Sequence, residues 1–303
     1  MLVATVIVHY QNLEDTLRCV ESLQSLDYKE NAILIVDSCS PNKTGIKLKE
    51  LLPEVTVILN PENNGFAASC NVGIKHAQNL GANYIWLLNP DTSVASDALS
   101  QLIKAVKDNP DFAVFGSKVL YGDRQDIIWS AGAEINFKNR TLCMLGNSQP
   151  DGKEFSNNKA DCDYLPGCSL FASVETFCEL LPEEYFMYFE ETDWCQTLIR
   201  KGKKILLVAD SKVYHHTDDE KMQSTFHIYY YNRNQLMFWY KFASPIKRIA
   251  LICEVLFRRL PRNTYAYLKA PSGQLKATFM AHTLSSYDFI LGRSGKRPYT
   301  NRE

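Results

Sequence analysis

The first 116 residues alternate between short apolar segments and amphipathic helical segments, and this alternation is the strongest constraint on the fold. The apolar segments are rich in Val, Ile and Leu, as are strands that are buried on both faces of a parallel sheet. The rhythm therefore predicts an α/β protein with a doubly wound, mostly parallel sheet. We predict strands at Leu2–His9, Ala32–Val36, Val55–Leu59, Tyr84–Leu88 and Phe112–Gly116, and helices near Leu13–Leu26, Gly45–Leu52, Phe66–Leu80 and Ser96–Asp108.

The turn after the first strand lacks the glycines that bind phosphates in two common groups of α/β enzymes. It reads His9-Tyr10-Gln11-Asn12, whereas a dinucleotide-binding turn reads Gly-x-Gly-x-x-Gly. The sequence also contains no Walker loop. The sheet is thus Rossmann-like in its rhythm, but the pattern excludes a dinucleotide enzyme and a P-loop NTPase.

Beyond residue 120 the alternation of strands and helices breaks. Short β-like pieces between Tyr121 and Ser156 indicate a small antiparallel excursion, and Leu170–Ala172 indicates a returning strand. A helix over Glu191–Lys201 and a strand from Lys204 follow. The segment 226–303 is basic, aromatic and mostly helical, which predicts a C-terminal extension on a first domain that covers 1–225.

The C-terminal segment has a charge opposite to that of the rest of the chain. From Lys241 to Glu303 there are 12 Lys and Arg against 3 Asp and Glu, whereas the remainder has 21 against 31. A basic amphipathic segment of this kind suits an anionic membrane surface. Packing on the first domain or an oligomer contact explains it equally well. Nucleic-acid binding is disfavoured, because the aromatic residues lie in a helical context without a recognition motif.

Cysteine usage and hydropathy indicate the compartment. The nine cysteines show no paired spacing, as expected for reduced thiols in the cytoplasm. Leu2–Val8 is too short for a signal peptide, and Ile249–Phe257 is far shorter than the ~20 residues of a membrane span. We expect a cytoplasmic protein, with a peripheral position at the inner face of the plasma membrane if the basic segment binds lipid.

Acidic residues follow two of the predicted strands and begin a later helix. Asp37 ends the second strand, Asp91 follows the fourth in Leu87-Leu88-Asn89-Pro90-Asp91-Thr92, and Glu190-Glu191-Thr192-Asp193 opens the helix. Ligands of open α/β sheets bind at the carboxyl ends of the strands. A carboxylate delivered there suits a divalent metal that carries a diphosphate. Taken alone, Asp91 could equally cap the next helix, because helix signals follow it at once.

These motifs, in this order and spacing, resemble the inverting family-2 glycosyltransferases of the GT-A fold, in particular the bacterial rhamnosyltransferase-like branch that builds cell-surface polysaccharides. Each motif is weak alone, but together they cover nearly the whole chain. They are Val36-Asp37-Ser38-x-Ser40, Asn63-Asn64-Gly65-Phe66-Ala67-Ala68-x-x-Asn71-x-Gly73-Ile74, Leu87–Thr92, Pro166-Gly167, Tyr188-Phe189-Glu190-Glu191-Thr192-Asp193, Arg200-Lys201-Gly202, His215-His216, Tyr230-Tyr231-x-Arg233-Asn234 and Gly292-Arg293-Ser294-Gly295-Lys296.

The resemblance implies a Rossmann-like GT-A fold, with a mostly parallel sheet flanked by helices, a small antiparallel excursion and a helical C-terminal tail. The catalytic domain would cover 1–225, with its nucleotide-binding half at about 1–120 and its acceptor half at about 121–225. The basic extension would cover 226–303.

The resemblance also implies which residues bind the donor. Tyr10 and Asp37 would hold the nucleotide base, with the Asp37 carboxylate accepting from the N3–H of a pyrimidine. The alternative for Asp37 is a turn or cap residue. Asn71 would face the ligand from a helix, unless it is a surface residue. Further donor contacts would come from Asn64, Gly65, which permits a positive φ, and Phe66.

A metal site is implied at the end of the fourth strand. Asn89 takes the place of the first carboxylate of the family's metal motif, so that Asp91 would be the direct ligand of Mg²⁺ or Mn²⁺. His215 would complete the site, and imidazole together with carboxylate slightly favours Mn²⁺. A purely structural histidine is the alternative.

The catalytic base would be Glu191. The family usually reads Glu-Asp-x-Asp here, whereas this chain has a second Glu, whose extra methylene shifts the carboxylate by about 1 Å. Glu190 and Asp193 would orient the acceptor or the start of the helix. The plainer interpretation is that these acidic residues favour a helix N-terminus electrostatically.

The sequence thus predicts a metal-dependent inverting glycosyltransferase. Its donor would be dTDP-rhamnose or a UDP-sugar, and its acceptor a growing cell-surface polysaccharide or lipid-linked glycan. The unusual Glu191 leaves one alternative open, a catalytically impaired nucleotide-sugar-binding partner in a polysaccharide assembly complex. A sugar nucleotidyltransferase is disfavoured, because no glycine-rich first loop is present to bind a triphosphate.

Overall fold

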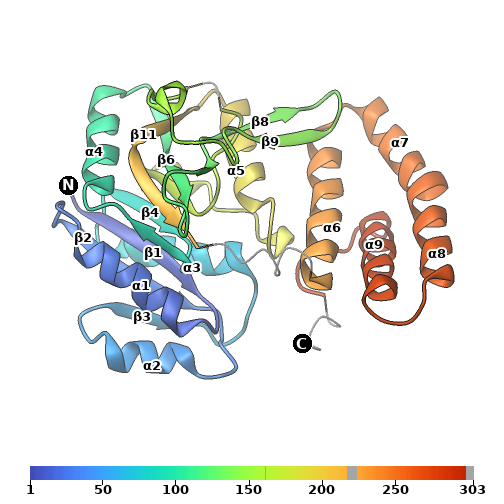
Figure 1. Cartoon of the computed structure of the whole chain (residues 1–303), viewed down its shortest axis with the longest axis horizontal. Helices are drawn as coiled ribbons and strands as arrows, with labels where there is room; N and C mark the ends of the chain where they lie inside the picture. Colours follow the sequence, from blue (N-terminus) through green and yellow to red (C-terminus); the bar gives the residue numbers. More distant parts are fainter. Residues whose placement is uncertain (161, 217–223, 298–303) are drawn as a thin grey trace. The chain divides into compact units, whose positions relative to one another are not determined.

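The computed structural model describes residues 1–160, 162–216 and 224–297, and the chain forms two compact units (Figure 1). The first unit comprises Met1–Asn136, Thr141–Pro182 and Glu191–Thr217. The second comprises Phe137–Arg140, Glu183–Glu190 and Asp218–Glu303. The sequence assigned the two short segments of the second unit to the domain 1–225. They belong to the second unit because Phe137 packs on Phe238, while Arg233 and Asn234 bind the backbone at Tyr185.

Within the described residues, the first unit is built on one nine-stranded sheet, which confirms the predicted α/β class. The strand order is β3-β2-β1-β4-β10-β6-β11-β5, with β7 paired to β6. β1 to β4 are mutually parallel, and so are β6 and β11, whereas β10 runs antiparallel between β4 and β6. The strands are β1 (Val3–His9), β2 (Asn31–Asp37), β3 (Thr56–Leu59), β4 (Tyr84–Leu88), β5 (Thr92–Val94), β6 (Phe112–Tyr121), β7 (Ile128–Ser130), β10 (Ser169–Ser173) and β11 (Lys204–His215).

Helices pack on both faces of this sheet. Val3 and Ile7 of β1 contribute to one core together with apolar residues of α1 and α4. Alternate residues of a strand face opposite sides, so Val6 belongs to the other face. There Gly73 of α3 approaches so closely that a Cβ would lie 2.3 Å from Cγ1 of Val6. The helices of this unit include α1 (Leu13–Gln24), α2 (Thr44–Leu51), α3 (Phe66–Asn79) and α4 (Ala98–Asp108), and α5 (Glu190–Arg200) belongs to it from Glu191 onward.

A short strand, and not a helix, follows Asp91, contrary to the sequence prediction. Thr92 and Val94 are buried in β5, which pairs antiparallel with the end of β11. Helix α4 begins only at Ala98, and Asp97, not Ser96, occupies its N-cap position. The sequence prediction missed β5 because a three-residue edge strand is stabilised by a partner more than a hundred residues away.

The predicted antiparallel excursion is present between β6 and β10. It contains β7 and a two-stranded hairpin of β8 (Ala133–Asn136) and β9 (Thr141–Met144). Asp151 fixes the excursion to the sheet, because its carboxylate accepts hydrogen bonds from Lys118 of β6 (2.6 Å) and Lys212 of β11 (2.8 Å).

The second unit is helical in its C-terminal part, as the sequence predicts. Helix α9 packs against α6 and α8, and Asp288 of α9 accepts a hydrogen bond of 2.7 Å from the Tyr229 hydroxyl of α6. Among the helices that the structure describes, none combines the length and the hydropathy needed to cross a bilayer. The elements are α6 (Thr225–Phe242), α7 (Pro245–Glu254), the π-helical η5 (Val255–Arg259), α8 (Leu260–Lys269) and α9 (Gln274–Ile290).

Candidate active site

The carboxyl ends of β1 and β2 lie side by side, because His9 and Asp37 are register partners. Tyr10 follows His9 and is 45% exposed, so its ring is accessible to a ligand. Asp37 is buried, and its carboxylate accepts from the backbone N–H (3.2 Å) and the hydroxyl (2.5 Å) of Ser40. These bonds shape the loop between β2 and α2, and binding of a nucleotide base by Tyr10 and Asp37 stays a prediction.

The glycine turn before α3 has the predicted backbone. Gly65 adopts φ 97° at the N-cap of α3, and its N–H donates to the Asn63 side chain (3.0 Å). Asn64 is exposed and donates to the Glu62 carboxylate (3.1 Å), and Phe66 begins the helix half-buried. Because a residue with a Cβ is strained at this φ, the glycine fixes the entry of α3 at the carboxyl edge of the sheet.

Asn71 is buried in α3 and binds the chain at Leu181. Its amide nitrogen donates to the Leu181 carbonyl (2.9 Å), and its amide oxygen accepts from the Leu181 N–H (3.0 Å). The two bonds hold the chain at Leu181 against α3 within the first unit. The alternative of a surface residue is therefore wrong, and a direct contact of Asn71 with the donor stays a prediction.

Asp91 and His215 meet at this edge of the sheet. Nε2 of His215 lies 3.2 Å from Oδ1 of Asp91, and the backbone N–H of His216 donates to the Asp91 carbonyl (2.9 Å). The Trp129 ring packs edge-on against His215, with 4.7 Å between the ring centroids. The preceding turn is closed by the Thr92 hydroxyl, which donates to the Asn89 carbonyl (2.7 Å).

This pair fits a divalent cation that takes its remaining ligands from a substrate. Nδ1 of His215 is buried and has no hydrogen-bond partner among the described residues. Hydrogen bonds to the rest of the fold therefore do not occupy this nitrogen. A carboxylate with an imidazole is a suitable donor set for Mn²⁺ or Mg²⁺. No group of three or more His, Cys, Asp and Glu side chains arranged to hold a metal occurs in the described ranges. Two protein ligands leave most of the coordination sphere to other groups.

Glu191 lies in the first turn of α5, beside the Pro166-Gly167 turn. A Cβ on Gly167 would lie 3.4 Å from Cγ of Glu191, which is an ordinary van der Waals distance, so the two residues are neighbours. Burial raises the pKa of the Glu191 carboxyl, although hydrogen bonds from the backbone and from Thr192 act in the opposite direction. The Thr192 hydroxyl lies 3.1 Å from the Glu191 carboxylate. A carboxylate with a raised pKa is a stronger proton acceptor.

The buried thiol of Cys168 connects the two halves of the site. Burial raises its pKa, and the negative charges of Asp91 and Glu191 raise it further. Cys168 lies between Gly167, which neighbours Glu191, and Ser169 of β10, whose register partner is Leu88 at the end of β4. Asn89 to Asp91 follow Leu88 directly, so both carboxylates lie on this side of the sheet. The structure thus brings the predicted metal ligand and the predicted base together.

Glu190 and Asp193 are both buried, and Glu190 belongs to the second unit whereas Asp193 belongs to the first. Asp193 accepts a hydrogen bond from Thr197 one turn later in α5 (3.1 Å). The aromatic run before Glu190 is mainly core of the second unit, where Phe186 packs with Tyr229 and Tyr230. Whether Glu190 and Asp193 contact an acceptor stays a prediction.

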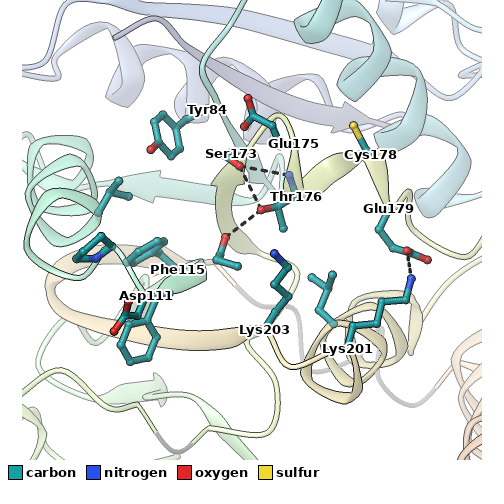
Figure 2. A pocket seen from close by; sticks show the side chains of 15 residues that line it. Tyr84, Asp111, Phe115, Ser173, Glu175, Thr176, Cys178, Glu179, Lys201 and Lys203 are labelled. Atoms are coloured by element: carbon teal, nitrogen blue, oxygen red, sulfur yellow. Dashed lines mark hydrogen bonds and ion pairs between the residues drawn. The ribbon is translucent and has the colours of Figure 1, made fainter.

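A cavity of about 730 Å³ in the first unit lies away from these residues (Figure 2). Tyr84 and Phe112 line it at the amino ends of β4 and β6, and Ser173 lines it at the end of the antiparallel β10. Asp91 and His215 lie at the opposite, carboxyl edge of the sheet. Figure 2 shows the Glu179 carboxylate paired with Lys201 at this cavity.

The sequence prediction missed Trp129, Cys168 and Thr192. Trp129 lies in the excursion, whose loops are not readable from local patterns. Thr192 lay inside a quoted motif without an assigned role, whereas Cys168 directly follows the quoted Pro166-Gly167. The position of Cys168 depends on the pairing of β10 with β4, and that of Trp129 on the pairing of β7 with β6 and of β6 with β11.

Solved structures with a similar fold identify the class of this architecture. The "Crystal structure of GalNAc-T7 with UDP, GalNAc and Mn2+" superposes with a TM-score of 0.60 at 17% identity, covering 96% of this chain. The chain spans only 56% of that protein. The structure of S. aureus TarS 1-349 gives a TM-score of 0.53 at 13% identity, covering 97% of this chain and 92% of TarS. The fold is the GT-A fold of glycosyltransferases.

The family follows from the sequence profile of glycosyl transferase family 2, which matches residues 5–167. This range is more than half of the chain and contains most of β1 and all of β2 to β9, together with Asp37 and Asp91. The chain therefore belongs to glycosyltransferase family 2 and is a glycosyltransferase.

Two characterised relatives have low sequence identity to this chain. The dTDP-rhamnosyl transferase RfbF of Shigella flexneri is 21% identical over 280 residues, which cover 88% of each chain. The low-salt glycan biosynthesis hexosyltransferase Agl10 of Haloferax volcanii is 22% identical over 239 residues, covering 77% of this chain and 73% of Agl10.

Proposed function

We propose that the protein is an inverting glycosyltransferase that moves a sugar from a nucleoside diphosphate donor to a growing glycan, with Glu191 as the base. The observation that carries the proposal is that the Asp91–His215 pair and Glu191 lie on the same side of the sheet. The start of β10 pairs with the end of β4, next to Asp91, and Gly167 just before β10 neighbours Glu191. In this proposal Asp91 and His215 serve the diphosphate, and Glu191 accepts a proton.

Glu191 takes the proton of the acceptor hydroxyl while that oxygen attacks the anomeric carbon, and the nucleoside diphosphate departs. Its buried carboxyl and raised pKa favour this role. Asp91 and His215 would hold the divalent cation, which would orient the diphosphate. When bound, Mn²⁺ or Mg²⁺ offsets the negative charge of the leaving diphosphate.

The donor is dTDP-rhamnose or a UDP-sugar in this proposal. The name of RfbF, a dTDP-rhamnosyl transferase, and that of Agl10, a hexosyltransferase of glycan biosynthesis, support a hexosyl donor. Tyr10 and Asp37 would receive the pyrimidine at the ends of β1 and β2. Asp37 must then exchange part of its contact with Ser40 for the base. The acceptor is a cell-surface polysaccharide or a lipid-linked glycan.

The test is release of the nucleoside diphosphate from a panel of dTDP- and UDP-sugars with the full chain and Mn²⁺. We expect release from one donor class, lost on chelation of the metal and reduced by at least about 10²-fold in Asp91→Ala. Asp108→Ala, an exposed carboxylate at the end of α4, is the matched control and should retain full turnover. Full turnover of Asp91→Ala would refute the metal assignment.

Donor binding and turnover must be measured separately. Calorimetric titration that gives donor binding, together with no turnover on any acceptor and no effect of Glu191→Gln in cells, would favour the catalytically impaired binding partner instead.

A further inference from the structure

A continuous helical stretch of the second unit runs from Pro245 to Lys269 through α7, η5 and α8 (Figure 1). One side of this stretch is buried, with Leu251, Val255 and Asn263 at intervals of four and eight residues. This side packs within the unit, since α8 and η5 contact α9 and α7 contacts α6.

The other side of the stretch is apolar and exposed. Ile246 is 81% exposed and Phe257 is 78% exposed, which are extreme values for large apolar side chains. Together with three further residues they form what we call the apolar stripe, which consists of Ile246, Ile249, Phe257, Tyr265 and Leu268. Contiguous exposed apolar surface of this kind marks an interaction site rather than scattered surface residues.

Cations flank the apolar stripe. Residues 245–269 contain six Lys and Arg and a single acidic residue, Glu254. Glu254 pairs with Arg140 and Arg259, so it does not neutralise the other Lys and Arg residues of the stretch. Lys247, Arg258 and Arg262 have no ion-pair partner among the described residues. An apolar strip bordered by free cations is complementary to a surface that is apolar inside and anionic outside.

We propose that the apolar stripe and its flanking cations dock the second unit on an anionic lipid bilayer. The stretch lies in the plane of the interface, with the stripe at the boundary between headgroups and acyl chains and the cations among the lipid phosphates. A second copy of the chain fits this face less well, because two such strips would bring like charges together. The proposal does not rest on the transfer reaction, because lipid binding is measurable without donor or acceptor.

The test is co-sedimentation of the full chain with vesicles. Vesicles of phosphatidylcholine with about 30% phosphatidylglycerol should bind the protein at least about tenfold more tightly than phosphatidylcholine alone. Raising the salt to about 0.5 M should weaken binding severalfold, because surface electrostatics are screened. Equal partition to both vesicles, or no binding to the anionic ones, would overturn the proposal.

Two double variants and one control locate the surface. Ile249→Glu/Phe257→Glu should lower binding by more than about tenfold, since charges cannot enter the acyl boundary. Ile46→Glu/Leu51→Glu, on α2 with 46% and 56% exposure, is the matched control and should bind like the wild type. Arg258→Gln/Arg262→Gln should weaken binding to anionic vesicles and remove most of its salt dependence.

Light scattering of each variant separates lipid binding from self-association. A wild-type dimer that Ile249→Glu/Phe257→Glu dissociates, with vesicle binding unchanged, would assign the stripe to a second copy and overturn the proposal. Vesicle binding that is equally weak in the stripe variant and in the α2 control would overturn it as well.

Discussion

The Glu191 carboxyl should lose its proton at a higher pH than an ordinary glutamate, because burial raises its pKa. A general base works only in its ionised form. We therefore expect kcat/KM to fall with acid along a limb whose midpoint lies above the usual glutamate value of about 4.3. The measurement is nucleotide release against pH at low donor concentration. Activity that is flat down to about pH 4.5 would exclude Glu191 as the base.

Conservative variants of Glu191 distinguish the charge from the shape of the side chain. Glu191→Gln should lower turnover by about 10²–10⁴-fold and leave donor affinity in place, because only the proton acceptor is lost. Glu191→Asp keeps the carboxylate but withdraws it from the Gly167 side, and it should retain an intermediate activity. If the Gln variant turns over like the wild type, another group accepts the proton.

At the residue scale, sequence could anticipate the position of a group but not its partners. The motif around Asp37 contains Ser40, so the turn in which Ser40 binds the Asp37 carboxylate could be predicted from the sequence. Asn71 was identified as important, yet its partner is Leu181, 110 residues away. The hydrogen bonds between the Asn71 amide and the Leu181 backbone depend on the tertiary structure, and no local sequence pattern predicts them.

At the element scale, the loop before α5 is held in a strained conformation by the second unit. Phe186, Tyr188 and Phe189 have positive φ values of 66°, 71° and 76°. Bulky side chains rarely adopt this region, which costs on the order of 1 kcal/mol each. Within the unit, Asn234 binds the loop backbone by contacts of 2.7–3.0 Å from its amide nitrogen to the carbonyls of Tyr185, Met187 and Tyr188.

Asn234→Ala should therefore destabilise the second unit by about 3 kcal/mol, because buried carbonyls lose their donor and the loop conformation loses its support. Denaturant unfolding measures the loss. Asn232→Ala is the matched control on the same helix, since its amide makes one bond to the Ile228 carbonyl and should cost about 1 kcal/mol. Equal losses in the two variants would contradict the proposed support of the loop.

The elements that sequence could predict are those stabilised by their own residues. Helix α1 starts after Asn12, whose side chain caps it by accepting from the Asp15 N–H, as the local pattern predicts. The antiparallel insertion of β10 between β4 and β6 is a property of the whole sheet, and the sequence indicated only a returning strand. Strand β5 and the left-handed loop before α5 exist because distant segments bind them, so their residues alone do not predict them.

At the scale of the whole molecule, both units contain buried or half-buried histidines whose neutral form is favoured by burial. Burial lowers the pKa of His9 and His216 in the first unit and of His227 and His282 in the second. The unfolded chain binds these protons near pH 6.5, whereas the folded chain binds them only at lower pH. The contribution of these histidines to the free energy of unfolding is therefore fully present above about pH 6.5. It is lost as the pH falls below this value, by about 1.4 kcal/mol per unit of lowered pKa.

His9 offers the most direct test of this acid sensitivity in the first unit. Its ring is fully buried at the end of β1, with Nδ1 at 2.7 Å from the Thr16 hydroxyl and Nε2 at 2.8 Å from the Thr44 hydroxyl. The neutral ring can donate through one nitrogen and accept through the other, so it links α1 and α2 to the sheet. Gln also has a donor and an acceptor but does not titrate.

His9→Gln should lower the stability of the first unit at pH 8 by about 1–2 kcal/mol, because the amide cannot reproduce both ring contacts. The loss of stability between about pH 7 and 5.5 should be smaller than in the wild type, since one of the acid-sensitive groups is gone. Hydrogen exchange read by mass spectrometry reports on each unit separately and so removes the second unit's histidines from the comparison. An unchanged pH dependence of exchange in the β1 peptides would show that the His9 pKa is not lowered by folding.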